Sequence, residues 1–138
     1  MILNILATAP LSIGQRSNNL SDFKRTIIDL LKFRDDRDWK QFHSLNNLIT
    51  ALSIEVAELA ELGLWSNDVE MKEKLKNKKF HESFQDECAD IFHYLLLIAD
   101  CAEIDLLEAS KSKIKKNDAK YPISKAFGKS TKYTNLDD

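Results

Sequence analysis

The chain has 138 residues, of which 43% are hydrophobic and 30% charged, and its formal net charge is −2. This length corresponds to one domain with a single core, and the nearly balanced charge argues against a general binder of nucleic acids or membrane surfaces. Only three glycines and two prolines occur, and the long stretches between them lack the alternation of strands, so the sequence predicts an all-α fold.

The two cysteines and the N-terminal segment bear on the compartment. Cys88 and Cys101 lie on one predicted helix, thirteen residues apart, and a separation of about 20 Å excludes a disulfide between them within the chain. Reduced thiols in an apolar helix are typical of a cytosolic protein. Residues 1–9 lack the basic start of a signal peptide, and their apolar run is interrupted by Asn4. No run reaches the roughly 18 apolar residues that span a bilayer, so we expect a cytoplasmic protein.

The first predicted helix covers residues 21–34, with Ser21 as its N-cap. A charged connection over residues 35–43 follows and carries Trp39, Phe42 and His43. Exposed aromatic side chains in such a connection either pack on their own domain or stack on a nucleotide base. Both interpretations stay open.

Two further helices should carry most of the core. Ser44 is the expected N-cap of the second helix, which runs to about Leu64 and meets a stop signal at Gly63. Residues 66–79 are rich in lysine and too poor in apolar residues for a core helix, so we expect a loop with one short helix. The third helix covers residues 80–101, and its dense apolar stripe predicts the most buried element.

The fourth helix should begin after Asp105 and end before Pro122, because the residue preceding a proline disfavours the helical conformation. The expected organisation is then a flexible or packing arm over residues 1–20, a helical domain over residues 21–122, and a tail over residues 123–138 that packs on the bundle or on a neighbouring subunit.

One face of the fourth helix is polar and basic. Such a face is exposed to solvent by default, but if it faced acidic side chains it would offer ammonium donors to phosphate groups. Its residues are Lys113, Lys116, Asn117 and Lys120.

Two pairs of carboxylates stand on the second and third predicted helices. Glu55 and Glu58 form the first pair, and Glu87 and Asp90 form the second. Because the members of each pair are three residues apart, they lie about one turn apart on the same side of a helix. The flanking positions are apolar, so the acids lie inside or beside the stripes that form the core.

Four carboxylates in such positions repel one another and lose hydration, so a positive charge should accompany them. Oxygen ligands without His or Cys at a matching spacing favour Mg²⁺, or alternatively Mn²⁺, over zinc. The competing interpretation is that the acids are solvated residues of amphipathic helices.

Five short motifs follow one another along the chain. They are Arg37-Asp-Trp-Lys-Gln-Phe-His43, Asn47-Leu, Glu55-Val-Ala-Glu-Leu-Ala-Glu-Leu-Gly-Leu-Trp65, Asp86-Glu-Cys-Ala-Asp-Ile-Phe-His-Tyr94 and Lys113-x-x-x-Asn117-x-x-Lys-Tyr-Pro122. Their order resembles the MazG-like, all-α nucleoside triphosphate pyrophosphatases, and most of all their dCTP pyrophosphatase branch. The resemblance covers roughly residues 20–133. An E-x-x-E pair alone would be a weak signal, whereas its combination with E-x-x-D, the Trp, the Tyr and K-Y-P is specific.

The resemblance implies a four-helix, bundle-like fold that assembles into dimers or tetramers. It also implies cleavage of a nucleoside triphosphate, dCTP or a modified dCTP, into the monophosphate and pyrophosphate, as in sanitation of the nucleotide pool. The implied Mg²⁺ ligands are Glu55, Glu58, Glu87 and Asp90, with Glu58 and Glu55 as the catalytic acids. The implied substrate-binding residues are Trp39, His43, Trp65 and Tyr94 for the base, and Lys113, Asn117, Lys120 and Tyr121 for the sugar and phosphates.

The sequence departs from this branch where Gly63-Leu64 precedes Trp65, since an aromatic-polar pair often stands there, and this leaves the base preference open. One alternative is an enzyme of the same fold with another base or a phosphoribosyl-nucleotide substrate. The other is a non-catalytic helical interaction module whose acids are solvated. The expected partners are a nucleoside triphosphate and further copies of the chain, without a membrane or a nucleic-acid polymer.

Overall fold

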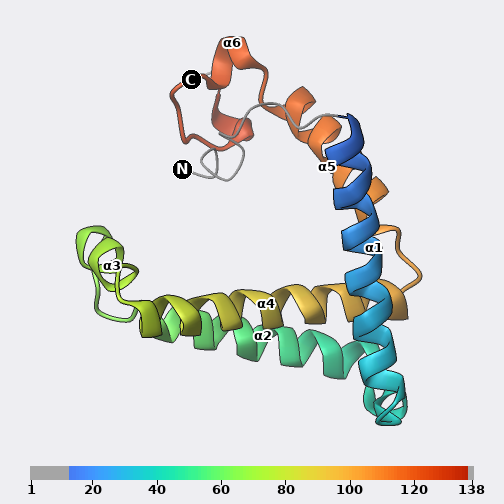
Figure 1. The fold of residues 1–138 in the computed structure, drawn as a ribbon. Helices are drawn as coiled ribbons and strands as arrows, with labels where there is room; N and C mark the ends of the chain where they lie inside the picture. The colour runs from blue at the N-terminus through green and yellow to red at the C-terminus, as the bar shows by residue number, and fades with distance from the viewer. Residues whose placement is uncertain (1–12, 137–138) are drawn as a thin grey trace. The chain divides into compact units, whose positions relative to one another are not determined.

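The computed structural model describes residues 13–136, and every regular element in this range is helical (Figure 1). This confirms the all-α expectation. No helix of the described range is long and apolar enough to cross a membrane. Residues 1–12, most of the expected N-terminal arm, lie outside this range. The elements are α1 (Ile13–Asp35), η2 (Trp39–Phe42), α2 (Leu45–Leu62), α3 (Asp68–Lys74), α4 (Lys78–Cys101), α5 (Leu106–Lys120), α6 (Ile123–Ala126) and η3 (Tyr133–Asn135).

The chain divides into two compact units, residues 1–98 and residues 99–138. The first unit contains α1, η2, α2, α3 and nearly all of α4, and the second contains α5, α6 and η3. The domain boundaries expected after residues 20 and 122 stay predictions.

Local capping fixes most helix ends where the sequence predicts them. The Ser44 hydroxyl accepts a hydrogen bond from the backbone N–H of Asn47, 3.2 Å away, at the start of α2. The Asp105 carboxylate accepts one from the N–H of Glu108 at 3.0 Å, and α5 ends before Pro122 as expected. The short helix expected within residues 66–79 is α3, which a capping box between Asn67 and Glu70 begins.

The start of the first helix differs from the prediction, whereas the end of α2 agrees with it. The first helix begins at Ile13 rather than after Ser21, which lies inside it, because the polar residues before Ser21 have only moderate helix penalties and no proline interrupts them. Gly63 is the C-cap of α2, as expected, and its φ of −96° is not left-handed. The left-handed residue of this turn is Trp65, with φ 63°.

In the first unit, α2 and α4 run antiparallel, connected through α3, and α1 crosses near the start of α2 and the end of α4 (Figure 1). Leu48 on α2 and Leu96 on α4 are 2% and 4% exposed and belong to the core. Phe23 on α1 packs on Phe92 on α4, with ring centroids 6.1 Å apart. The expectation that α4 is the most buried helix therefore holds for its C-terminal half. This pairing of α2 with α4 brings the predicted acids together.

The cap of α2 provides a test of the fold. Replacing Ser44 with Ala leaves the Asn47 N–H without its acceptor, so we expect the free energy of unfolding to fall by about 1 kcal/mol and the Tm by roughly 3 °C. The control is Ser53→Ala within α2, because the Ser53 hydroxyl only donates to the Ile49 carbonyl and its loss should be neutral or slightly stabilising. Thermal unfolding followed by circular dichroism measures both. Equal Tm values would contradict the capping role.

Candidate active site

Three of the four predicted acids meet between α2 and α4. One oxygen from each of Glu55, Glu58 and Glu87 lies within 4.8 Å of the other two. Glu55 and Glu87 are half-buried, while Glu58 is exposed. Among the side chains of residues 22–136, these three have no lysine or arginine partner. The cluster is therefore a concentration of negative charge without a compensating cation from the described chain.

Burial and mutual repulsion disfavour the charged forms of two of these acids. Burial, followed by the charges of Glu58, Asp90 and Glu87, raises the pKa of Glu55 above its ordinary value. Burial, Glu58 and Asp90 likewise raise the pKa of Glu87, and its Oε2 is buried without a hydrogen-bond partner among the described residues. A divalent cation would satisfy this oxygen and relieve the repulsion, so the donor set fits a hard metal ion with oxygen ligands.

Asp90, the fourth predicted ligand, does not belong to the group of three. It lies one turn after Glu87 on α4, close enough for its charge to raise the pKa of both Glu55 and Glu87. Its Oδ1 is 3.9 Å from Nδ1 of His93, and it also lines a neighbouring cavity. Asp90 therefore connects the acidic cluster with that cavity.

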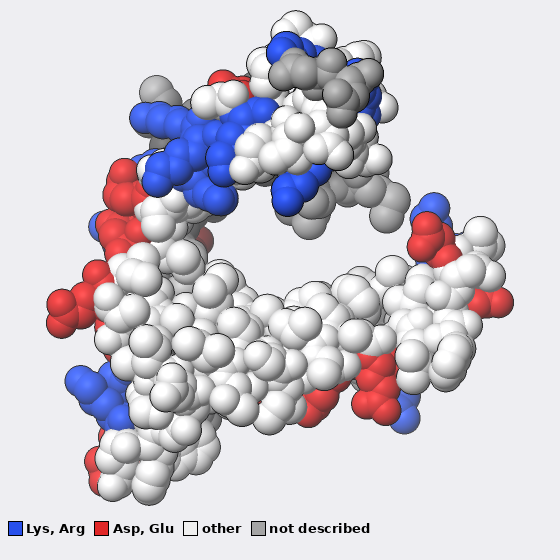
Figure 2. Space-filling model, turned by 180° about the vertical axis from the view of Figure 1, so that it is seen from behind, with Lys and Arg blue, Asp and Glu red and all other residues white. Residues whose placement is uncertain are grey.

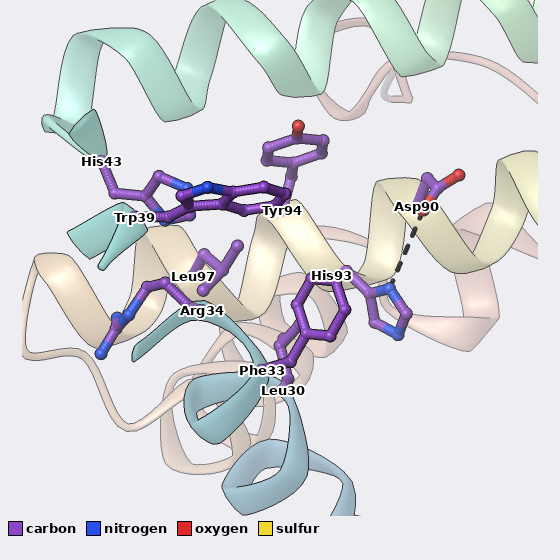
Figure 3. A pocket seen from close by; sticks show the side chains of 9 residues that line it. All are labelled: Leu30, Phe33, Arg34, Trp39, His43, Asp90, His93, Tyr94 and Leu97. Atoms are coloured by element: carbon purple, nitrogen blue, oxygen red, sulfur yellow. Dashed lines mark ion pairs between the residues drawn. The ribbon is translucent and has the colours of Figure 1, made fainter. Parts of the chain in front are cut away.

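The cavity has a volume of about 210 Å³ and lies among α1, the connection with η2, and α4 (Figure 3). Figure 3 shows the rings of Trp39 and His43 from the connection beside that of Tyr94 from α4. These are three of the four residues predicted to bind a base. The volume is below the roughly 300–1,000 Å³ of drug-sized pockets, so the cavity suits one ring of a ligand. Its lining residues are Leu30, Phe33, Arg34, Trp39, His43, Asp90, His93, Tyr94 and Leu97.

An ordered turn holds the aromatic side chains of the connection. Asp38 adopts the left-handed conformation with φ 54°, and the Gln41 amide donates to its backbone oxygen at 3.0 Å and to its carboxylate at 2.6 Å. The Asn47 amide donates to the carbonyl of Phe42 at 2.9 Å. The connection is therefore fixed by its own polar side chains, which makes it able to present Trp39 in one position.

Two side chains of the cavity, His43 and Tyr94, favour their neutral forms. Burial first, and then the positive charge of Arg34, lower the pKa of His43, which keeps its imidazole neutral near pH 7. Burial, with the charges of Glu55 and Asp90, raises the pKa of Tyr94, so its phenol keeps its proton. The cavity can thus offer neutral hydrogen-bonding groups beside its aromatic walls.

The sequence did not indicate five of the lining residues, namely Leu30, Phe33, Arg34, His93 and Leu97. Leu30, Phe33 and Arg34 are three and four residues apart at the end of the helix that leads into the aromatic connection, and His93 directly precedes Tyr94. Their positions next to the recognised motifs could have indicated that these residues lie near the site. Arg34 is nearly inaccessible to solvent, and its Nε donates to Asp35 at 2.7 Å.

Trp65, the fourth predicted base-binding residue, does not line the cavity. It is 94% exposed and lies in the turn after α2, whereas Trp39 lies before α2. The 18 residues of α2 separate the two by about 27 Å at 1.5 Å per residue. A single chain therefore cannot bring both indoles to one base.

The predicted phosphate-binding residues lie in the second unit. Lys113, Asn117 and Lys120 are exposed on α5, and Tyr121 caps its end. Nζ of Lys120 lies 4.9 Å from the centre of the Tyr133 ring, which meets the Tyr121 ring edge-on. Residues 106–136 contain eight lysines and two acids, and Figure 2 shows a group of Lys and Arg side chains close together. The second unit is therefore strongly basic.

Comparison with known proteins agrees with the motifs. Residues 50–136 match the MazG-like family. The dCTP pyrophosphatase 1 of Rattus norvegicus is 36% identical over 130 residues, which cover 94% of this chain and 74% of that protein. That of Homo sapiens is 39% identical over 117 residues, which cover 85% and 67% respectively. A crystal structure of a pyrophosphatase from Archaeoglobus fulgidus superposes with a TM-score of 0.69 at 40% identity, covering 73% of this chain and 93% of that one.

The family match covers more than half of the chain, and the archaeal pyrophosphatase shares its fold. The chain belongs to the MazG-like family. Within this family its similarity is to dCTP pyrophosphatases. The resemblance inferred from the five motifs is thereby confirmed.

The acidic cluster should respond to divalent ions. We expect millimolar Mg²⁺ to raise the Tm of the EDTA-treated protein, because the ion binds the folded cluster and not the unfolded chain. Glu87→Gln removes one charge at nearly constant volume, so the variant should melt higher than wild type in EDTA and should gain less on addition of Mg²⁺.

The matched control is Glu82→Gln on the same helix, where the exposed carboxylate only pairs with Lys78 at 3.8 Å. Its Tm gain with Mg²⁺ should equal that of the wild type in differential scanning fluorimetry. The shared metal site is refuted by identical gains for the wild type and both variants.

Proposed function

We propose that the chain is a Mg²⁺-dependent dCTP diphosphatase, which hydrolyses dCTP or a 5-substituted dCTP to the monophosphate and pyrophosphate. Family and relatives make the chain an enzyme, a nucleoside triphosphate diphosphatase. The proposal adds the metal, the base and the residues that act. The observation that carries it is the cluster of Glu55, Glu58 and Glu87 without a cation partner, which Asp90 connects to an aromatic cavity.

The four acids would divide into ligands and a base. A bound Mg²⁺ supplies the charge that lets an acidic site hold a triphosphate, and it lowers the pKa of coordinated water. Glu55, Glu87 and Asp90 would hold the ion. The first two are half-buried, and burial and neighbouring negative charges raise their pKa values, so a cation would stabilise their charged forms. Glu58 faces the same cluster but is exposed, so its carboxylate can reach a water, orient it for in-line attack on phosphorus and accept its proton, with Glu55 beside it.

The cavity supports recognition of a pyrimidine. Trp39 and Tyr94 supply aromatic faces, and a stacked base gains ~1–3 kcal/mol from each such contact. The neutral ring of His43 and the phenol of Tyr94 are available to the polar edge of the base. The apolar side chains of Leu30 and Phe33 in the lining would contact a substituent at the 5 position. A cavity of about 210 Å³ favours the smaller ring of cytosine over a purine.

The active form in this proposal is a homo-oligomer, a dimer or a tetramer. Apolar side chains of α2 remain about half exposed, among them Ile49, Ile54 and Val56, and a second copy would cover them. The distance between Trp39 and Trp65 points the same way, since a base enclosed by both indoles must lie between two chains. Lys113, Asn117, Lys120 and Tyr121 would bind the sugar and phosphates in the assembled site.

The compartment and role follow from the same chemistry. Cys88 and Cys101 form no disulfide with each other, as expected in the reducing cytoplasm. There the reaction would remove dCTP, or modified dCTP, from the nucleotide pool before it reaches a polymerase.

The decisive test is a panel of dCTP, dTTP, dUTP, dATP and dGTP incubated with the protein and Mg²⁺, with the products resolved by ion exchange. We expect dCMP and pyrophosphate, and the highest kcat/KM for dCTP. Glu58→Gln should lower kcat by about 10²–10⁴-fold, the usual contribution of a general base, with little change in KM.

The control for this variant is Glu73→Gln, since Glu73 is exposed on α3 and pairs only with Lys76. It should keep the wild-type rate. Release of orthophosphate, preference for a purine, or near-normal turnover by Glu58→Gln would each contradict the assignment.

The shared site predicts complementation between two variants. Trp39→Ala and Trp65→Ala should each raise KM for dCTP by about 10- to 100-fold, since ~1.4 kcal/mol is tenfold in an equilibrium constant. If the two indoles come from different copies, a mixed dimer contains one intact site and one site lacking both. Subunit exchange between the variants should then restore about a quarter of the wild-type activity at low dCTP.

A chain carrying both substitutions serves as the control and should gain nothing on mixing with itself. Absence of any recovery between variants that exchange subunits, or a monomer in light scattering that is fully active, would refute the shared site.

A further inference from the structure

Arg37 begins the motif that contains Trp39 and His43, yet it does not line the cavity. Its guanidinium carbon lies 3.6 Å from the centroid of the Phe33 ring and 5.8 Å from that of the Trp39 ring. Its Nη1 also donates a hydrogen bond to the backbone oxygen of Phe33 at 3.0 Å. A planar cation held against one ring by both stacking and a hydrogen bond has little freedom to move.

The two rings that Arg37 contacts are walls of the cavity. Phe33 and Trp39 both line it, and their rings meet edge-to-face with centroids 5.8 Å apart and planes at 81°. Neither ring is fixed by burial, because Phe33 is 47% and Trp39 44% exposed. Their orientation must therefore come from specific neighbours, and Arg37 is a neighbour of both.

The turn after α1 produces this arrangement. The N–H groups of Arg37 and Asp38 donate to the carbonyls of Arg34 and Asp35 at 3.3 and 3.0 Å. Asp38 then turns into the left-handed region, with φ 54° and ψ 29°. The chain reversal folds the Arg37 side chain back over Phe33, four residues earlier, and beside Trp39, two residues later. The contact joins a helix end to the connection that carries the aromatic side chains.

We propose that Arg37 is a positioning residue that fixes Phe33 and Trp39 as the walls of the cavity, so that base binding depends on a side chain outside the cavity. The consequence for base binding rests on the proposed function. The fixing of Trp39 concerns the free protein and is measurable without any substrate.

The first measurement is fluorescence of Trp39 alone. The chain has two tryptophans, so Trp65→Phe leaves Trp39 as the only indole. In this background, Arg37→Ala should increase quenching by acrylamide and shift the emission to longer wavelength, because the ring loses its neighbour and gains solvent contact. Arg25→Ala is the control, since Arg25 is exposed on α1 and pairs only with Asp29; it should change neither quantity.

The second measurement separates positioning from chemistry. With Trp65 intact, Arg37→Ala should raise KM for dCTP by about three- to tenfold, the range of a cation–π contact at a partly exposed site, and leave kcat within about twofold. Arg37→Lys should recover part of the loss, because an ammonium retains the charge but cannot stack as a plane. If Arg37→Ala does not fold, Arg37→Met keeps an apolar stem over Phe33, and the same two readouts decide.

Unchanged quenching and unchanged KM in a folded variant would overturn the proposal, as would a lower kcat at constant KM, which would assign Arg37 to the chemical step. If wild type hydrolyses none of the nucleotides, the proposed function fails, and the quenching of Trp39 still decides whether Arg37 fixes the ring.

Discussion

The carboxylates of Glu55, Glu58 and Glu87 repel one another where α2 packs on α4. The apolar contacts of α2 with α4, with Leu48 and Leu96 in the core, bring the three carboxylates within 4.8 Å of one another. Hydrophobic burial thus stabilises an arrangement that its own charges oppose. A cation that binds the cluster would reduce this repulsion. Its binding would therefore stabilise the folded protein and also provide the positive charge that a polyphosphate needs. Natural active sites commonly retain such local instability for function.

Local chemistry explains which helix ends could be predicted. Ser44 and Asp105 act as N-caps because a side-chain oxygen accepts from an N–H three residues later, and this depends on neighbouring residues alone. The predicted start of α1 was wrong. A helix extends cooperatively through residues whose helix propensity is only moderately unfavourable, and a serine inside it does not end it. The stop at Gly63 agrees with the prediction, and the left-handed residue of the turn that follows is Trp65.

The residues of the candidate site that belong to short sequence motifs could be predicted. The spacing of the acids and the order of the motifs indicated Glu55, Glu58, Glu87, Tyr94 and Trp39, and the structure places all of these in the cluster or the cavity. The contribution of α1 was missed, because it depends on how α1 crosses the end of α4, which no periodicity within α1 records. For the same reason the sequence could not show that Trp39 lines the cavity and Trp65 does not. A motif gives the order of residues along the chain but not the distance between them in space.

The first unit separates charged from neutral chemistry. In the cluster, carboxylates lie without a cation partner from the described residues, whereas burial keeps His43 and Tyr94 of the cavity in their neutral forms. Triphosphate charge would therefore be balanced at one place and the base would be selected at another. Asp90 lines the cavity and is close enough to the cluster for its charge to raise the pKa of Glu55 and Glu87. Such a division lets the cavity change its base preference through side chains such as Leu30 or Phe33 without altering the acids. It also explains why an aromatic wall needs a neighbour like Arg37: rings that select a base by its shape must stay in place.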